Sequence, residues 1–306
     1  MNLLPAITEH FSSRKKVVFS GTDPGTVTTS ITVPMTLESV FASINRFQAL
    51  ASIEDSSDDR ALYTFDVNPL PEPYKITAGL VNNLTFLKKH QKKQQRRQRR
   101  GVDKETQQMK LAKENREQEV RTKRVYGKVT AKERRHIRSH VQLLPGEPIP
   151  SVIHCFGHWQ GINSPIKGHF RRGTKKIREQ HRVHRYVGIT NEYNTSKTCP
   201  FCFSKVVLHR TRRIIDGREQ IVRLNGAIEC VHPRCPARRI KYTTRGRDAN
   251  AAANIALSGA SIILSSDRQP LPPFRHNANH TRYTLANELL TVVTPELVPR
   301  DSIRDE

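Results

Sequence analysis

The stretch CVHPRCPARRIKYTTRGRDANAAANIAL, residues 230–257, decides the fold of this chain. It begins with a pair of cysteines, Cys230 and Cys235, and ends in an alanine-rich run that is typical of a closely packed helix. An acidic residue, Asp248, stands directly before that run. A cysteine pair of the metal-binding type that leads so directly into a helix indicates a small module inserted just before the last helix of a larger domain.

A second cysteine pair lies upstream, so the pattern is Cys-x2-Cys, 27 intervening residues and Cys-x4-Cys. Two short chelating loops brought together form a tetrahedral thiolate site that suits zinc or an iron–sulfur cluster. The residues between the pairs alternate in polarity and contain Asp-Gly, which predicts a β-hairpin. We expect a structural Zn²⁺, because four protein ligands leave no open position for a substrate. The expected ligands are Cys199, Cys202, Cys230 and Cys235.

Other interpretations of the cysteines remain open. They could be unrelated reduced thiols, or the Cys-x2-Cys pair could be a redox pair, which would leave the second pair unexplained. The fifth cysteine, Cys155, lies in the apolar stretch SVIHCFGHW and is expected to be a small buried hydrophobic side chain. An odd number of cysteines in a reducing compartment argues against a disulfide framework.

The charge balance of the chain is extreme, with 52 Lys plus Arg against 28 Asp plus Glu and a formal net charge of +24. This charge favours a polyanionic partner, with nucleic acid as the first choice and an anionic membrane as the second. No apolar run is long enough for a membrane-spanning helix, and the N-terminus lacks the pattern of a secretory signal. We expect an intracellular protein that has no membrane partner and is nuclear if its source is eukaryotic.

Strands and helices alternate along the chain. Apolar or β-branched runs predict strands at residues 17–21, 26–34, 61–67, 151–159 and 186–190. Helices are expected at 103–138, in the second half of 166–185, and at 248–264. This alternation predicts an α/β domain with the cysteine module grafted into a loop.

Two acids stand at the ends of these elements. Asp23 follows the first strand in GTDPGT, and Asp248 begins the last helix. Taken alone, Asp-Pro-Gly is a common turn and Asp is a common N-cap residue. Together, in a very basic protein, they suggest phosphodiester cleavage, for which clustered carboxylates hold two Mg²⁺ ions about 4 Å apart. A third acid is needed, and Glu192 follows the strand at 186–190, whose end can converge on the same sheet edge.

The combination of GTDPGT, TSKTCPFC, CVHPRCP and RDANAAANI resembles the RuvC nuclease core of the TnpB and Fanzor proteins, transposon-encoded relatives of the type V CRISPR nucleases. The resemblance covers roughly residues 15–265. It implies an α/β, RNase H-like (RuvC) domain with a long basic helical insertion and an inserted four-cysteine zinc ribbon. It also implies RNA-guided, Mg²⁺-dependent DNA cleavage, with Asp23, Glu192 and Asp248 as the catalytic, magnesium-binding residues.

The resemblance divides the chain into six parts. The RuvC domain is expected in three pieces, at residues 1–82, 146–195 and 241–265. The parts between and after them are a basic helical insertion at 83–145, a zinc ribbon of the type that binds target nucleic acid at 196–240, and a C-terminal tail at 266–306.

The chain departs from the family pattern in two ways. Bacterial members carry the second acid at the end of the strand that here reads SVIHCFGHW, where this chain has none. Eukaryotic Fanzor-like members carry it just before the zinc ribbon, so Glu192 is expected to be the compensating ligand and His158 is a lesser candidate. The family's large N-terminal part, which grips the guide RNA, is expected to be missing, because the first nuclease strand comes so early in the chain.

Two basic segments are candidates for nucleic-acid contact through neutralised phosphates. The run at 88–100 has eight Lys or Arg in thirteen residues, and its single sign predicts disorder without a partner. It could equally be a solvated or nuclear-localisation patch, whereas the segment 166–185 lies between the active-site strands and favours nucleic-acid contact. The candidate residues are Lys88, Lys89, Lys92, Lys93, Arg96, Arg97, Arg171, Arg172, Lys175, Lys176 and Arg178.

The sequence therefore favours a Mg²⁺-dependent endonuclease core that acts on DNA with a guide RNA. The alternative from another class is a non-catalytic, nucleic-acid-binding remnant of a transposon protein, which the expected loss of the N-terminal part favours and the three retained acids oppose. A transcription factor is a third interpretation, opposed by the all-cysteine ligand pairs and by the lack of an evident recognition helix between them.

Overall fold

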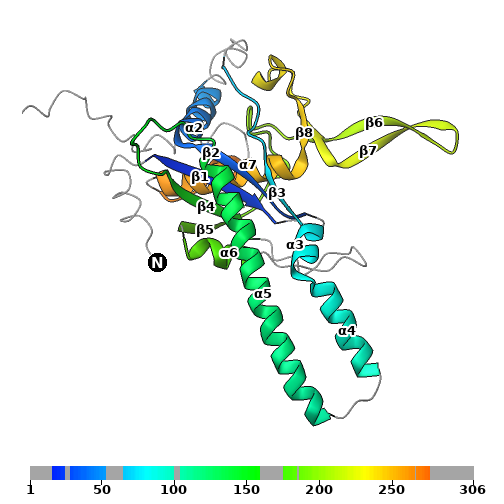
Figure 1. Cartoon of the computed structure of the whole chain (residues 1–306). Coiled ribbons are helices and arrows are strands. Elements are labelled where there is room, and N and C mark those ends of the chain that lie inside the picture. The colour runs from blue at the N-terminus through cyan, green and yellow to red at the C-terminus, as the bar shows by residue number, and fades with distance from the viewer. Residues whose placement is uncertain are drawn as a thin grey trace, which may run out of the picture.

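The structure of the 306-residue chain is a computed structural model that describes residues 16–24, 28–52, 65–99, 104–158, 175–184, 186–265 and 267–275. These residues form a mixed α/β fold in which a helical arm and a thin β-ribbon project from a central sheet (Figure 1). Within these ranges, none of the helices is both long and apolar enough to cross a membrane.

The central sheet is mixed and has five strands in the order β3-β2-β1-β4-β5. The strands are β1 (Val17–Asp23), β2 (Thr28–Thr36), β3 (Tyr74–Thr77), β4 (Ser151–Gly157) and β5 (Tyr186–Thr190). β1 pairs antiparallel with β2 and parallel with β4, and β5 continues the parallel half of the sheet. β1 and β4 are buried almost throughout because helices cover both faces, which accounts for their short apolar runs.

Four of the five strand predictions are confirmed, at β1, β2, β4 and β5, and the prediction at 61–67 is wrong for its described part. Residues 65–67 form no strand, residues 61–64 lie outside the described ranges, and β3 follows later. The reason is an alternative packing site for the apolar side chains of this segment. Val67 and Leu70 pack against the cysteine cluster instead of joining the sheet.

Helices cover the two faces of the sheet. α2 (Leu37–Ser52), which the sequence did not reveal, and α7 (Arg247–Leu264) contribute to one core cluster together with Cys155 of β4. α5 (Lys104–Arg138) and α6 (Lys175–Arg182) pack on the other face, where they meet the next residue of β4, Phe156. The three helix predictions are therefore confirmed, and so is the burial of Cys155, which raises the pKa of its thiol to about 12.

A helical arm carries the first basic segment away from the sheet (Figure 1). α3 (Ala78–Thr85) leads into α4 (Leu87–Arg99), which lies beside the first half of α5. The expectation of disorder at 88–100 is thus wrong for residues 88–99. The reason is that α5 offers polar partners: Lys93 Nζ donates to Glu114 Oε1 at 3.0 Å, and Gln94 donates to Asn115 at 2.8 Å. The ion pair offsets part of the repulsion within the run, and the amide hydrogen bond holds α4 against α5.

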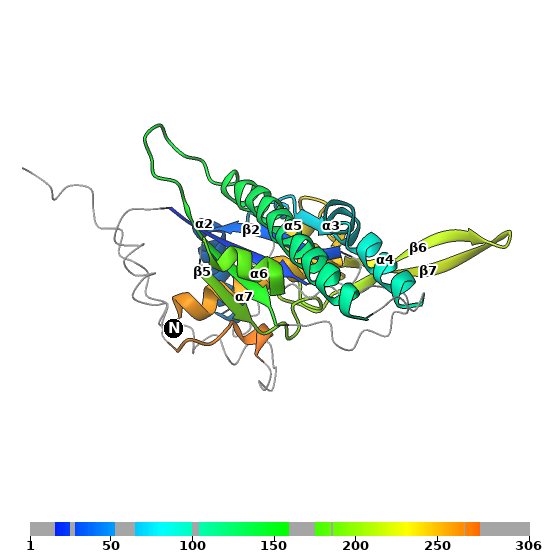
Figure 2. The same cartoon turned by 60° about the horizontal axis from the view of Figure 1, so that its bottom comes forward.

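The predicted hairpin between the cysteine pairs is confirmed as a long β-ribbon that projects from the body (Figure 2). Its strands are β6 (Val207–Ile215) and β7 (Arg218–Glu229), and β7 also pairs with the short β8 (Thr244–Gly246). The turn residues Asp216 and Gly217 have φ angles of 50° and 75°. Asp-Gly is the pair that a turn with two left-handed residues favours, so the sequence signal was sound.

The first residues of the tail belong to the core. The short helix η3 (Pro272–Phe274) follows α7 after a turn, and the side chains of Leu271 and Phe274 are fully buried in the cluster that also contains α7 residues. The structure describes residues 267–275 of the tail, and this part packs as a continuation of the sheet domain.

A buried polar network lies on the α5 and α6 face of the sheet. Ser20 Oγ lies 2.8 Å from His154 Nδ1, and the rings of His154 and His181 are in contact, tilted by 44° with centroids 3.9 Å apart. His181 Nε2 lies 2.8 Å from Glu133 Oε2, and that carboxylate also accepts a hydrogen bond from Thr32. All five residues are fully buried, so the network ties α5 and α6 to strands β1, β2 and β4.

We predict that this network makes the fold sensitive to acid. Burial, then the charges of His181 and Arg134, lower the pKa of His154 well below its ordinary value of 6.5. In the unfolded chain the His154 imidazole is therefore protonated as the pH drops below about 6.5, whereas in the folded chain it stays neutral. The free energy of unfolding accordingly falls as the pH drops through this value. One such proton costs about 1.4 kcal/mol at one pH unit below 6.5. Urea unfolding at pH 7.5 and 5.5 should show this loss, and His154→Gln should show a smaller one; an equal loss in both would contradict the assignment.

Candidate metal centre and acidic site

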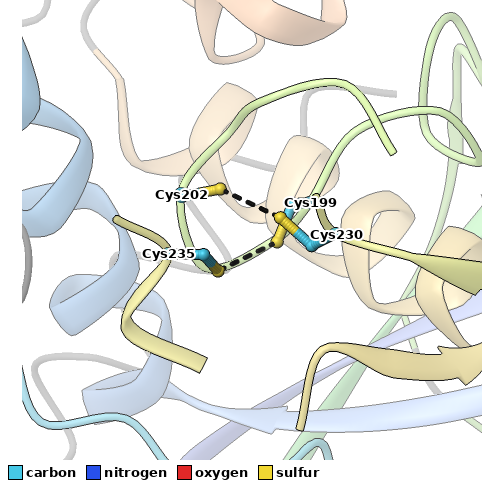
Figure 3. Close-up of side chains that lie close together, drawn as sticks. All are labelled: Cys199, Cys202, Cys230 and Cys235. Carbon is cyan, nitrogen blue, oxygen red and sulfur yellow. Dashed lines mark hydrogen bonds between the residues drawn. The ribbon is translucent and has the colours of Figure 1, made fainter. Parts of the chain in front are cut away.

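The four paired cysteines converge in one buried cluster, as the sequence predicts. All are free thiols, and their sulfur atoms lie within 4.8 Å of one another. Cys199 Sγ is 3.8 Å from Cys235 Sγ, and Cys202 Sγ is 3.5 Å from Cys230 Sγ (Figure 3). A tetrahedral zinc ion with Zn–S bonds of about 2.3 Å requires sulfurs about 3.8 Å apart. The cluster therefore has the spacing to bind a metal such as zinc.

Local backbone hydrogen bonds shape the first cysteine loop. The amide of Phe203 donates to Cys199 O at 2.9 Å, and the amide of Cys199 donates to Ser204 O at 2.8 Å. Phe203 takes a left-handed φ of 58° to close this loop, and its ring packs edge-on against Phe47 of α2. The cysteine loop is thereby anchored to the core of the sheet domain.

Two buried arginines flank the cysteine cluster. Arg245 of β8 donates through Nη2 to Cys199 Sγ at 3.1 Å and through Nε to Asn250 Oδ1 of α7 at 2.8 Å. Arg46 of α2 donates to Pro200 O at 3.1 Å. Although burial raises the pKa of Cys199, hydrogen bonds from the other three cysteines and the charge of Arg245 lower it. Arg245 therefore favours the thiolate state that a metal ion requires. Burial lowers the pKa of Arg46, and the charges of Cys199, Cys235 and Cys202 oppose this shift.

Two asparagines of α7 hold the segment that precedes the first cysteine. Asn250 and Asn254, which stand one helical turn apart, both donate through Nδ2 to the carbonyl oxygens of Thr195 and Thr198, at distances of 2.7 to 3.2 Å. We call these four contacts the asparagine clamp. The clamp gives a physical reason for the co-occurrence of TSKTC and RDANAAANI in the sequence, because one motif supplies the carbonyls and the other the amide donors.

Helix α7 lies unusually close to the sheet, as its small residues predict. A Cβ atom on Gly21 of β1 would lie 1.8 Å from the carbonyl oxygen of Ala252 and 2.3 Å from the amide nitrogen of Ala256. A Cβ atom on Gly259 would lie 2.3 Å from Cys155 Sγ of β4. Glycine at both contacts is thus a steric requirement, and this approach brings the first turn of α7 to the sheet edge where β1 ends.

The three predicted acids come near one another at that edge. Burial, then the charges of Asp248 and Glu192, raise the pKa of Asp23 well above its usual value, while Arg247 opposes the shift. Glu192 follows β5, and its carboxylate lies against Gly157 at the end of β4. Asp248 lies in the first turn of α7, 3.5 Å from Arg247 Nε.

The cap of α7 separates two interpretations of Asp248. The N-cap residue is Gly246, and no side chain caps the helix, so Asp248 is not the N-cap that a common use of Asp would suggest. The helix dipole favours an acid in the first turn of a helix. Because Asp248 does not cap the helix, its carboxylate is available to other partners.

The acids are more widely spread than the cysteines. Among the described residues, only the four cysteines place three or more ligand atoms within 4.8 Å of one another. His158, the lesser candidate, has an exposed side chain, while its backbone amide donates to Thr190 O.

The basic candidates lie on two helices. α4 carries Lys88, Lys89, Lys92, Lys93, Arg96 and Arg97, and α6 carries Lys175, Lys176 and Arg178. The side chains of Lys89, Lys92, Lys93 and Arg96, together with Lys175 and Lys176, are exposed, and Arg178 is partly buried. Arg171 and Arg172 lie outside the described residues.

Comparison with known proteins adds no relative. No protein-family model and no curated protein matches the sequence.

Several residues of the site were not identified from the sequence. Arg46 gave no sequence signal, because nothing near it on α2 points to the cysteines. Asn250 and Asn254 stood inside the quoted motif, and their spacing of one helical turn on a buried helix was a signal for a shared polar partner. Gly157 gave no signal of its own, because the sequence shows only that the end of this strand lacks an acid.

Proposed function

We propose that this chain is a RuvC-like, RNase H-like, metal-dependent DNA endonuclease core that uses Asp23, Glu192 and Asp248. The observation that carries the proposal is the convergence of the three acids at one edge of the sheet: Asp23 ends β1, the Glu192 carboxylate lies against Gly157 of the neighbouring strand β4, and Asp248 lies in the first turn of α7. Burial and the charges of Asp248 and Glu192 accordingly raise the pKa of Asp23. Three acids gathered at one sheet edge from distant parts of the chain store electrostatic repulsion. Proteins keep such clusters at functional sites, and a bound cation removes the repulsion.

The donor set fits magnesium. Carboxylate oxygens are the protein ligands that Mg²⁺ takes, and they are the only ligand type that these three residues offer. A site of this kind holds two ions about 4 Å apart. When bound, such ions lower the pKa of a water molecule and offset the charge that develops on the phosphate. The backbones of Asp23 and Asp248 belong to β1 and α7, and that of Glu192 to a hydrogen-bonded loop, which supports a pre-positioned set of acids.

The remaining features suit a nucleic-acid substrate. The exposed lysines and arginines of α4 and α6 can neutralise phosphates, and the net charge of +24 supports binding to a polyanion. The structural metal in the cysteine cluster would be Zn²⁺, which holds β8 and the start of α7 in place. We further propose that the substrate is DNA, that a guide RNA is bound as in the TnpB and Fanzor proteins, and that the protein acts in the nucleus if its source is eukaryotic.

A second candidate function is nucleic-acid binding without cleavage, as a transposon-derived remnant. One observation favours it: the carboxylate oxygens of the three acids do not all lie within 4.8 Å of one another. A site that has lost its metal would keep the basic helices and the cysteine module while its acids separate.

Cleavage of labelled single- and double-stranded DNA by the purified chain, with sequencing of any RNA that copurifies, tests the proposal. We expect Mg²⁺-dependent cleavage that EDTA stops and that Asp248→Asn abolishes while DNA binding is kept. Asp216→Asn at the ribbon turn removes the same charge far from the acids and should cleave normally. Cleavage by Asp248→Asn at the wild-type rate would refute the proposal, and tight binding without cleavage by either protein would favour the second candidate.

A further inference from the structure

Gly157 occupies the position in β4 that lies nearest to Asp23. The parallel register pairs Gly21 with Cys155 and Thr22 with Phe156, so its continuation sets Asp23 beside Gly157. Side chains alternate along a strand, and Cys155 faces α7, where it meets Gly259. A side chain at position 157 would therefore share the α7 face of the sheet with Asp23.

The backbone at Gly157 does not require glycine. Among the described glycines, only Gly146 and Gly217 have left-handed φ angles, and Gly157 is extended within β4. Any residue could adopt this conformation. The reason for glycine must therefore lie in the space next to it.

That space holds the carboxylate of Glu192. A Cβ atom built on Gly157 would lie 2.0 Å from Glu192 Oε1, 2.5 Å from its Cδ and 2.8 Å from its Cγ. The conflict is with the far end of one flexible side chain, unlike that at Gly21, where the nearest atoms belong to the backbone of α7. A methyl group at position 157 would thus expel the carboxylate while the sheet and α7 kept their places.

The loop delivers Glu192 to this space from a fixed backbone. His158 N donates to Thr190 O at 3.0 Å, which continues the pairing of β4 with β5 beyond Gly157. Thr195 donates to Glu192 O through both its amide, at 3.2 Å, and its hydroxyl, at 2.9 Å. The asparagine clamp in turn holds Thr195 O. The backbone of Glu192 is thereby tied to α7, and only its side chain can yield.

We propose that Gly157 is a positioning residue for Glu192: its missing side chain leaves the space beside Asp23 in which the Glu192 carboxylate takes part in the metal site. The end of β4 thus supplies no ligand but leaves space at Gly157, and the loop after β5 supplies the acid, Glu192. The inference rests on the proposed function, because it assigns the acids to a divalent cation.

Gly157→Ala in the full chain tests the proposal, with Mn²⁺ as the probe in place of Mg²⁺. We expect Mn²⁺ affinity, measured by calorimetry without DNA, to fall about ten- to a hundredfold, as for lost support of a metal ligand. Cleavage should fall with it and recover in part at high Mn²⁺, while the thermal midpoint stays near that of the wild type. The matched control is Gly188→Ala in β5, whose Cβ would make an ordinary contact of 3.9 Å with His154 O.

A double-mutant cycle shows whether Gly157 acts through Glu192. In the Glu192→Ala background, Gly157→Ala should cause no further loss of Mn²⁺ affinity, because the group that it displaces is gone. An equal further loss in that background, or wild-type affinity in Gly157→Ala alone, overturns the inference and leaves the proposed function standing. If the wild-type chain binds no more Mn²⁺ than the Asp23→Asn variant does, the acids do not hold the ion. That outcome would overturn the proposed function and the inference with it.

Discussion

Replacing Asp23 by Asn should abolish Mg²⁺-dependent cleavage and at the same time stabilise the metal-free fold. The two effects have one cause. Burial, then the charges of Asp248 and Glu192, raise the pKa of the Asp23 carboxyl in the folded chain. A folded pKa above the unfolded value of 3.8 means that stability present below that value is lost as the pH rises through the folded pKa. At neutral pH the ionised acid therefore costs stability, and Asn removes this cost.

The loss of cleavage should be large. A metal ion contributes several kcal/mol of transition-state stabilisation, so losing a ligand that holds it corresponds to a rate loss of about a thousandfold. Rates at saturating DNA and Tm values with and without Mg²⁺ are the two measurements. We expect Mg²⁺ to raise the Tm of the wild type and to leave that of Asp23→Asn unchanged. Asp66→Asn, at a side chain that is 98% exposed, is the control that should change neither quantity. A less stable Asp23→Asn variant would contradict the electrostatic argument.

Removing the metal from the cysteine cluster should unfold the module around it. Four buried thiols and the guanidinium of Arg245 share one small space, and without a metal ion this single guanidinium cannot compensate four thiolates. Structural zinc contributes on the order of 10 kcal/mol to small zinc modules, which exceeds what the few apolar contacts there can replace. The purified chain should therefore contain one zinc ion, and Cys199→Ser should lose it.

Hydrogen exchange gives the sharper measurement of this effect. Chelation should remove amide protection first from residues 195–246 and then from the start of α7, since the asparagine clamp joins the two. Strands β1 and β4 should keep their protection, because their core does not include the cysteine cluster. Cys155→Ala is the matched control, since it removes the buried cysteine outside the cluster and should keep full zinc. A folded, fully protected module in zinc-free protein would contradict the prediction.

The spacing of residues and the small size of their side chains predicted much of this structure. The cysteine intervals predicted the cluster, and the alanines of residues 248–264 predicted the close approach of α7, because both depend on residues that stand near each other in the chain. Asp-Gly at 216–217 predicted the ribbon turn for the same reason.

What the sequence could not reveal depends on partners that are distant along the chain. The basic run of α4 is helical because Glu114 and Asn115 of α5 supply partners that no local pattern contains. Val67 packs against the cysteine cluster instead of joining the sheet, and these cysteines lie far downstream in the sequence. Gly157 has meaning only once the side chain of Glu192 is seen to fill its place.

The asparagine clamp also has a consequence for how the chain reaches its native state. Asn250 and Thr195 are 55 residues apart, so their contact closes a long loop and carries a large loss of chain entropy. A metal ion that joins Cys199 to Cys235, 36 residues apart, shortens the path between the clamp residues to about twenty residues and lowers this loss by about 1 kcal/mol. Metal loading should therefore speed the docking of α7 in the nascent chain, and with it the arrival of Asp248 beside Asp23.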